Sequence, residues 1–156
     1  MGNSLVNEVH HKFMKAAIAE AKKSLDEGGL PIGCVLAEDN KLISSGHNKR
    51  MQDDNPIAHG EIDCLKNAGR RKDYSRITLY TTLSPCEMCS GAILLFGIKN
   101  VVVGDNKIFQ GNIEYLRKRG VEITLMDDGD SFKLMDDYIH KHPDIWSEDI
   151  GGRNEH

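Results

Sequence analysis

The stretch that decides the fold is residues 76–96, RITLYTTLSPCEMCSGAILLF. Its first seven residues alternate and carry Ile, Leu, Tyr and Thr, which is typical of a β-strand. Residues 86–96 are largely apolar and follow a Ser-Pro pair, which predicts a helix directly after the strand. Cys86 and Cys89 lie in the first turn of that helix, and residues three apart share one helix face. The stretch therefore predicts a strand-to-helix junction that presents two thiols side by side.

Further strands and helices alternate on both sides of this junction. A polar turn joins the first two strands, so we expect them to form an antiparallel hairpin. The remaining alternation predicts an α/β protein with helices on both faces of a largely parallel sheet. No linker or repeat interrupts the pattern, so residues 1–156 are interpreted as a single domain. The other predicted strands are residues 31–37, 41–45, 101–103 and 121–126, and the other predicted helices are residues 8–27, 59–68, 114–119 and 131–142.

The charge balance restricts the class of partner. The chain has 156 residues and a net charge of −4. A protein that grips nucleic acid usually presents a basic patch, and the one basic run, residues 66–72, is more typical of a solvated turn. The composition therefore favours a small-molecule substrate over tRNA or single-stranded DNA.

The cysteines and the N-terminal residues bear on location. No apolar run reaches the roughly 18 residues of a membrane-spanning helix, and the first residues lack the pattern of a signal peptide. We therefore expect a cytoplasmic protein with no membrane partner. In such a protein, four cysteines indicate metal binding rather than a disulfide framework. Cys34 and Cys64 fall inside a predicted strand and a predicted helix, so these two are expected to be small buried residues.

A second short motif, His59-Gly60-Glu61, begins the predicted helix 59–68. One imidazole and two thiolates form a ligand set that suits Zn²⁺. Three protein ligands leave one tetrahedral position open, as in catalytic zinc sites. His59, Cys86 and Cys89 are therefore the predicted ligands of one zinc ion. Glu61 would lie beside this ligand set, where it can carry a proton.

The order H-x-E and then P-C-x-x-C is the signature of zinc-dependent nucleobase deaminases. Zinc lowers the pKa of its bound water to about 7 and so supplies a hydroxide nucleophile. Glu61 would take a proton from that water and pass it to a ring nitrogen and then to the leaving ammonia. Two other interpretations exist for the same residues. A structural zinc site would need a fourth protein ligand, and Glu61 alone could be a first-turn carboxylate that complements the helix dipole.

The chain resembles the cytosine deaminases of the fungal type, within the cytidine-deaminase-like superfamily, over nearly its whole length. The resemblance implies a three-layer α/β/α fold with a five-stranded mixed sheet and an active homodimer. It implies hydrolysis of free cytosine, and of 5-fluorocytosine, to uracil and ammonia, a step of pyrimidine salvage. Beyond the zinc motif, the likeness is carried by residues 27–33 (EGGLPIG), 46–48 (GHN), 79–86 (LYTTLSPC), 91–93 (GAI), 102–104 (VVG) and 146–151 (WSEDIG).

The resemblance also implies substrate contacts. Asn48 and the backbone N–H of Gly60 would hold the ring carbonyl, and Asp149 and the backbone carbonyl of Ser84 would hold the amino group. Without the resemblance, Asn48 would be interpreted as a turn residue and Asp149 as a solvated carboxylate. The pocket walls would come from Ile32, Phe109 and Trp146, under a lid formed by residues 143–151. Met51, which departs from the family pattern, would cover the flat ring more adaptably.

The chain departs from the fungal pattern near the predicted pocket. Met51 stands where the pattern has an aromatic residue, residues 53–58 differ, and the loop after Phe109 is one residue shorter. These departures leave open another small amino-heterocycle, such as isocytosine, creatinine or a triazine. A third hypothesis is an adenosine deaminase acting on tRNA, a family that usually has Ala where this chain has Gly60. A zinc-stabilised interaction domain is the non-enzymatic alternative.

Overall fold

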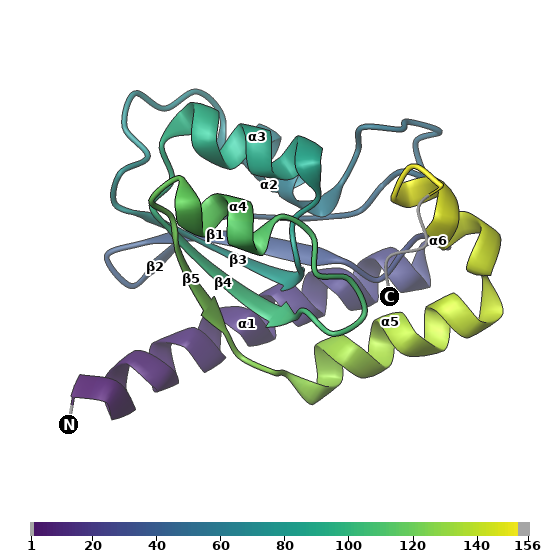
Figure 1. Cartoon of the computed structure of the whole chain (residues 1–156), viewed down its shortest axis with the longest axis horizontal. Coiled ribbons are helices and arrows are strands. Elements are labelled where there is room, and N and C mark those ends of the chain that lie inside the picture. The colour runs from purple at the N-terminus through teal and green to yellow at the C-terminus, as the bar shows by residue number, and fades with distance from the viewer. Residues whose placement is uncertain (1, 153–156) are drawn as a thin grey trace.

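The computed structural model describes residues 2–152, so Met1 and residues 153–156 of the predicted single domain lie outside the described residues. Figure 1 shows a central sheet with helices packed on both of its faces. The strands are β1 (Gly33–Glu38), β2 (Lys41–His47), β3 (Ile77–Leu83), β4 (Asn100–Asp105) and β5 (Glu122–Leu125). The helices are α1 (Gly2–Asp26), α2 (Gly60–Ala68), α3 (Glu87–Phe96), α4 (Ile113–Lys118), α5 (Gly129–Lys141) and α6 (Pro143–Asp149).

The predicted order of elements is confirmed, with two differences. Helix α1 begins at Gly2 rather than at residue 8. Leu5 and Val6 in this early part are 65% and 50% exposed, so no buried stripe marked it in the sequence. Helix α6 was not predicted, because it has only seven residues and follows α5 directly, with Pro143 in its first turn.

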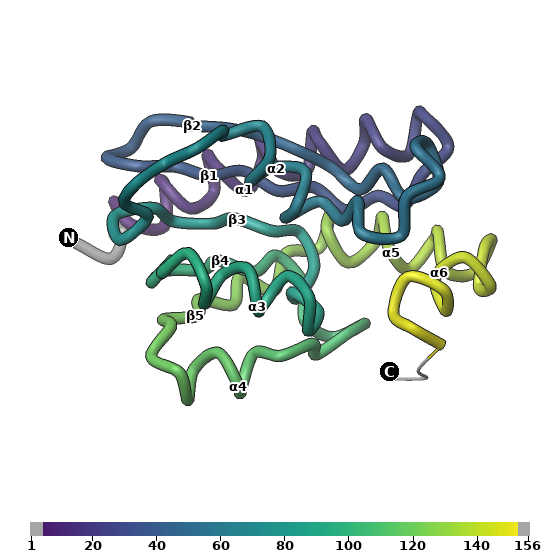
Figure 2. Tube along the Cα trace, turned by 90° about the horizontal axis from the view of Figure 1, so that it is seen from above, coloured from purple at the N-terminus to yellow at the C-terminus, as the bar shows by residue number. Residues whose placement is uncertain are grey.

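The sheet order is β2-β1-β3-β4-β5, and Figure 2 shows the strands side by side from β2 at one edge to β5 at the other. Strand β1 is antiparallel to both β2 and β3, whereas β3, β4 and β5 are parallel. The expectation of a largely parallel sheet was therefore wrong for the β1–β3 pair, and the five-stranded mixed sheet is confirmed. Strand β1 takes the inner position because it is buried along most of its length, whereas β2 is exposed at its start.

Alternate residues of the strands feed two cores. Leu36, Leu79 and Val101 pack with residues of α2, α3 and α4 on one face. Val35 and Tyr80 pack with α1 on the other face. This alternation is the two-residue period of a strand, and it gives the three layers of helix, sheet and helix.

A third apolar cluster lies beyond the sheet, past the carboxyl ends of β3 and β4. Figures 1 and 2 both place α6 at this end of the molecule. The Phe109 and Trp146 rings meet edge to face, with centroids 5.7 Å apart. The cluster comprises Leu30, Ile32, Leu83, Ile108, Phe109, Met135, Tyr138, Trp146 and Ile150. Helix α6 is therefore held by apolar packing against the sheet end.

One remaining prediction concerns burial. Cys34 and Cys64 are free and fully buried, as expected. Leu95 and Phe96 of α3 remain 79% and 42% exposed, so the chain itself does not cover that side of the helix. No helix within residues 2–152 has the length and apolar character needed to cross a membrane.

Candidate active site

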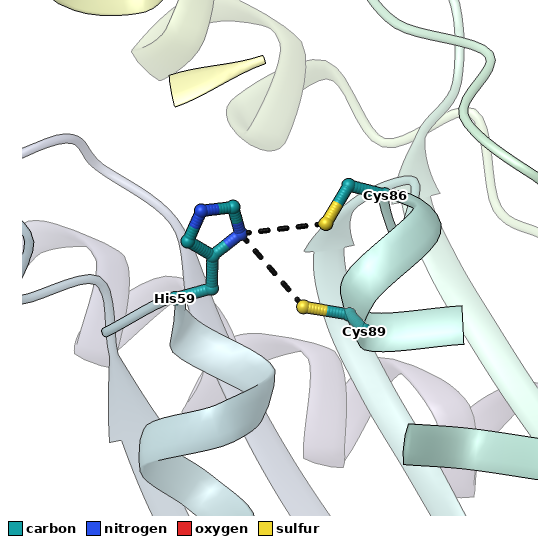
Figure 3. A group of neighbouring side chains, drawn as sticks. All are labelled: His59, Cys86 and Cys89. Carbon is teal, nitrogen blue, oxygen red and sulfur yellow. Dashed lines mark hydrogen bonds between the residues drawn. The ribbon is translucent and has the colours of Figure 1, made fainter. Parts of the chain in front are cut away.

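Two helix N-termini bring the predicted zinc ligands together. His59 is the N-cap residue of α2 and Cys86 is the N-cap residue of α3, and both have extended backbones. Cys89 lies one turn further along α3, so it faces the same way as Cys86. Figure 3 shows the His59 ring directed at both thiols. These residues come together because α2 and α3 pack on the same face of the sheet.

The spacing of the three side chains fits a tetrahedral metal. His59 Nδ1 lies 3.5 Å from Cys86 Sγ and 3.8 Å from Cys89 Sγ. Zinc bonds of about 2.0–2.3 Å at the tetrahedral angle would place such nitrogen and sulfur atoms roughly 3.6 Å apart. All three ligand atoms lie within 4.8 Å of one another, and no fourth His, Cys, Asp or Glu joins this group among the described residues. The site therefore fits one zinc ion with an open position, rather than a structural four-ligand site.

The charges around this site also favour a cation. A hydrogen bond from Cys89, together with His59, outweighs burial and lowers the pKa of Cys86 to about 4. The same hydrogen bond and burial raise the pKa of Cys89. Burial opposes a charge on His59, but Cys86, Asp149 and Glu61 outweigh it and raise the pKa of His59 to about 9. Binding of zinc would release the protons of the remaining thiol and of His59 Nδ1 to solvent, because the metal binds thiolate and neutral imidazole.

Glu61 lies in the first turn of α2 and is 4% exposed. Burial, together with Cys86, raises the pKa of its carboxyl to about 7. A carboxyl with a pKa near neutral can both accept and release a proton at neutral pH. The side chain is thus suited to proton transfer next to the metal ligands.

His59 also links the metal ligands to the C-terminal helix. Its Nε2 atom lies 3.5 Å from Asp149 Oδ1, on the side of the ring away from the thiols. The same oxygen accepts a hydrogen bond of 3.2 Å from Asn48 Nδ2. Burial raises the pKa of Asp149 against the opposing effects of His59 and Asn48. A carboxylate behind a zinc-binding histidine fixes the ring orientation, so Asp149 can serve both the metal and the pocket.

A small inner pocket adjoins these groups. Seven of the eight predicted substrate contacts line it: Ile32, Asn48, Gly60, Ser84, Phe109, Trp146 and Asp149. His59, Glu61 and Cys86 line it as well, so the ligand set and the predicted contacts face one space. Leu83 and Ile150 complete the walls. Sequence reasoning did not single out these two, although both belong to motifs that carry the family resemblance.

Met51 does not line this pocket. It is 42% exposed and borders a separate surface hollow together with Asp54 and Glu148. The backbone turns away after Asn48, since Arg50 N donates to Asn48 Oδ1 in a tight loop. The expectation that Met51 covers the substrate therefore has no support in the observed arrangement.

An outer cleft of about 400 Å³ leads to the inner pocket. Its lining includes His59 and Cys86 together with Met88 of α3 and Asn112. Arg50 and Glu148 also line it, and they form an ion pair of 3.2 Å. This pair connects the loop after β2 to α6 at the opening. Neither residue was predicted, because a single charged residue carries no distinctive sequence signal.

The sequence matches a described family over residues 7–105, namely "Cytidine and deoxycytidylate deaminase zinc-binding region". A cytosine deaminase of Candida albicans is 48% identical over 143 residues, which are 90% of this chain and 95% of the relative. A tRNA-specific adenosine deaminase of Streptococcus pyogenes serotype M1 is 38% identical over 107 residues, 67% of this chain and 63% of the relative.

Solved structures share the fold. A chain from studies of A-to-I editing by tRNA:A34 deaminases superposes with a TM-score of 0.68 at 24% identity, covering 80% of this chain and 99% of that one. Guanine deaminase from Bacillus subtilis gives a TM-score of 0.58 at 26% identity, covering 86% of this chain and 76% of that one. The layered arrangement of sheet and helices is thus common to deaminases of different substrate classes.

Proposed function

Because this chain belongs to the cytidine and deoxycytidylate deaminase family, and is a zinc-dependent hydrolase of C–N bonds, we propose that it converts free cytosine to uracil and ammonia. 5-Fluorocytosine would be a second substrate. The observation that carries the proposal is the contact of Asp149 with both Asn48 and His59. Through these contacts Asp149 links the Asn48 amide, which would bind the ring, to the metal ligand His59 and to helix α6 around one small pocket.

In the proposed reaction, the metal would activate water and a side chain of the protein would transfer the protons. Zinc bound to His59, Cys86 and Cys89 would supply activation of water at neutral pH. Glu61 carries the proton: it receives one from water and delivers it to the ring nitrogen next to the reacting carbon. The amino group then leaves as ammonia after Glu61 returns a second proton, and the oxygen of water remains as the new carbonyl. The pKa of Glu61 near 7 supports both transfers.

Asn48 would distinguish a free base from a nucleoside. Its Oδ1 accepts from Arg50 N, and one Nδ2 hydrogen is donated to Asp149. The amide retains one further acceptor site and one further donor hydrogen. Such a pair complements a ring carbonyl beside a ring N–H. A nucleoside lacks that N–H, because its sugar replaces the hydrogen.

The remaining polar groups, Ser84 and Asp149, would hydrogen-bond the amino group of the ring. Ser84 and Asp149 are 3% and 9% exposed, so an amine held there is shielded from water. An analogue without the amine would leave these groups unpaired, which costs binding. Ile32, Phe109 and Trp146 would supply the apolar walls around a bound base.

We also propose that the chain forms a single domain. Within it, residues 143–151 would act as a lid over the active site. Trp146 and Ile150 are 2% and 9% exposed and pack into the cluster around the pocket. Substrate would enter by displacement of this segment or through the outer cleft. A spin label or fluorophore on the exposed residue Glu148 would report whether the segment moves on binding.

The test is a substrate panel with zinc-loaded protein and detection of ammonia. We expect release from cytosine and 5-fluorocytosine, and none from cytidine at equal concentration. Isocytosine, creatinine and a triazine are the matched competitors. Turnover of one of these without turnover of cytosine would replace the proposed substrate and keep the chemistry.

A tRNA substrate is the second candidate, since a tRNA-specific adenosine deaminase is 38% identical. Two observations favour the free base. The net charge is −4, which opposes binding to a phosphate backbone. A Cβ at Gly60 would lie 3.2 Å from the Ile32 carbonyl oxygen, so the alanine usual in that family would be tight here. Salt-dependent binding of tRNA would revive this candidate.

We infer a homodimer that covers the exposed side of α3. Leu95 and Phe96 are exposed there, and Tyr115 of α4 lies on the same hollow as Leu95. Light scattering at micromolar concentration should give twice the chain mass. Leu95→Asp should shift it to the monomer, whereas Leu42→Asp, at an exposed leucine of the edge strand β2, should not.

A cytoplasmic location is also part of the proposal. All four cysteines are free, and free thiols are typical of a reducing compartment. Fractionation of cells that express the tagged chain, with activity assayed in each fraction, tests this location.

A further inference from the structure

Two of the stretches that carry the family resemblance, 27–33 and 46–48, contain residues for which the proposed reaction has no role. His47 precedes Asn48, and Glu27 lies just after α1. The structure brings them into contact: His47 Nε2 lies 2.8 Å from Glu27 Oε1. They belong to one network behind the pocket, on the side of Asn48 that faces α1.

His47 is held at both ring nitrogens. Its Nδ1 lies 2.9 Å from Glu20 Oε1, and its side chain is 8% exposed. Each ring nitrogen therefore lies within hydrogen-bond distance of a carboxylate oxygen, one from Glu20 and one from Glu27. Lys23 adds a bond of 2.7 Å to the other oxygen of Glu20. The bonds from Lys23 and His47 outweigh burial and lower the pKa of Glu20. The ring is therefore fixed between two carboxylates of the α1 end.

The backbone of the next residue, Asn48, is fixed by the same region. Its N–H donates to the Ile32 carbonyl at 2.9 Å. Its carbonyl accepts from Ser24 Oγ at 2.7 Å and from Gln52 Nε2 at 3.0 Å. A Cβ on Gly29 would overlap the Gln52 side chain, so a glycine is needed here for that second bond. Every backbone polar atom of Asn48 thus has a partner.

This backbone anchoring determines where the Asn48 side chain can reach. Asn48 is fully buried, and its amide is held between Arg50 N and Asp149. The two ends of the side chain, backbone and amide, are therefore both fixed. A misplacement of about 1 Å in a substrate-orienting group can cost around a hundredfold in rate. Rigid support behind Asn48 would protect against that loss.

We propose that Ser24 and His47 are positioning residues that act through Asn48: the end of α1 holds the substrate-binding amide in place. Neither residue lines the inner pocket. The expected change in KM for cytosine rests on the proposed function. The second readout, the stability of the loop 47–52, needs no substrate.

The experiment compares Ser24→Ala with Ser44→Ala in the zinc-loaded protein. Both serines are buried and donate from Oγ to a backbone carbonyl, Ser24 to Asn48 and Ser44 to Cys64 at 2.9 Å. We expect Ser24→Ala to raise KM for cytosine about fivefold, in line with the loss of one net hydrogen bond. Zinc content should stay at one per chain. Amide hydrogen exchange in residues 47–52 should speed up. Ser44→Ala should leave KM within about twofold and the exchange of 47–52 unchanged.

Three further variants complete the design. Ser24→Thr keeps a hydroxyl and should restore KM and exchange toward the wild type. His47→Gln can satisfy only one of the two carboxylates and should raise KM at least as far as Ser24→Ala does. Gln52→Ala removes the second donor to the Asn48 carbonyl. Because the Gln52 side chain is half-buried, this variant can replace Ser24→Ala if that protein does not fold, and the same changes in KM and exchange are expected.

The outcomes distinguish failure of the positioning role from failure of the proposed function. Equal KM and equal loop exchange in the Ser24→Ala and Ser44→Ala proteins would overturn the positioning role. So would a KM effect that merely follows loss of zinc. A wild-type protein that releases no ammonia from cytosine would count against the proposed function alone, because the exchange of residues 47–52 is measured without substrate.

Discussion

The two halves of the active site are built in different ways. The metal half consists of His59, Cys86 and Cys89, at the starts of two helices that share one face of the sheet. The recognition half, as proposed, joins Asn48 to Asp149, which are 101 residues apart. Short motifs suffice for the first half, whereas the second exists only after the chain has folded. His59 connects the halves, with Nδ1 toward the thiols and Nε2 toward Asp149.

The largest effect should come from breaking the metal half. Cys89→Ala removes one of three ligands, so zinc content should fall from one per chain toward zero. Activity should drop by more than about 10⁴-fold, because the pKa of water returns from about 7 toward 15.7. Cys64→Ala is the matched control, since Cys64 is equally buried and lies outside the ligand group. Metal analysis and ammonia release are measured together; retained activity without zinc would contradict the prediction.

The next largest effect separates proton transfer from metal binding. Glu61→Gln keeps the shape of the side chain but cannot accept a proton from water. We expect kcat to fall by about 10²- to 10⁴-fold, the usual contribution of a general acid–base group. Zinc content should remain at one per chain. Near-normal turnover in this variant would remove Glu61 from the mechanism.

Asp149→Asn tests the link between the two halves. The change removes the charge that faces His59 Nε2 and keeps a side chain of the same size. Zinc affinity should weaken by about 10- to 100-fold, as for other partners of metal ligands, and KM should rise as well. Competition with a chelator measures the first effect and steady-state kinetics the second. A rise in KM with unchanged zinc affinity would confine Asp149 to the recognition half.

The smallest effect is expected at the opening of the outer cleft. Glu148 is 62% exposed and pairs with Arg50 at 3.2 Å. Exposed pairs contribute about 0–1 kcal/mol, so Glu148→Gln should change stability and kcat/KM only slightly. Asp137→Asn, which breaks the exposed pair with Lys133, is the control. A large change in kcat for Glu148→Gln alone would give this pair a part in substrate entry or product release.

The elements of the fold were largely predictable. Apart from the start of α1 and the whole of α6, predicted boundaries lie within two residues of the observed ones. Periodicity finds these elements because each buries one face. It did not reveal the antiparallel pairing of β1 with β3, because pairing depends on which strand of the hairpin turns inward. The exposed start of α1 had no apolar stripe to detect.

The site was predictable to a different extent in its two halves. His59, Glu61, Cys86 and Cys89 could be chosen from residue chemistry and spacing. Asn48 and Asp149 were chosen only from family resemblance, since an isolated Asn or Asp resembles any surface residue. Met51, a departure from the family pattern, is exposed on a separate surface hollow, so its assignment to the pocket stays a prediction that the observed arrangement does not support.

By itself, the sequence determined the alternation of strands and helices, the zinc ligands and the proposed proton carrier. These depend on local periodicity and on donor atoms at short spacing, which the chain order contains directly. Only the tertiary structure decided the packing of α6 against the pocket, the double contact of Asp149 and the hydrogen bond of Ser24 to the Asn48 carbonyl. These contacts join residues that are distant along the chain, and burial in a common cluster brings them within hydrogen-bond distance.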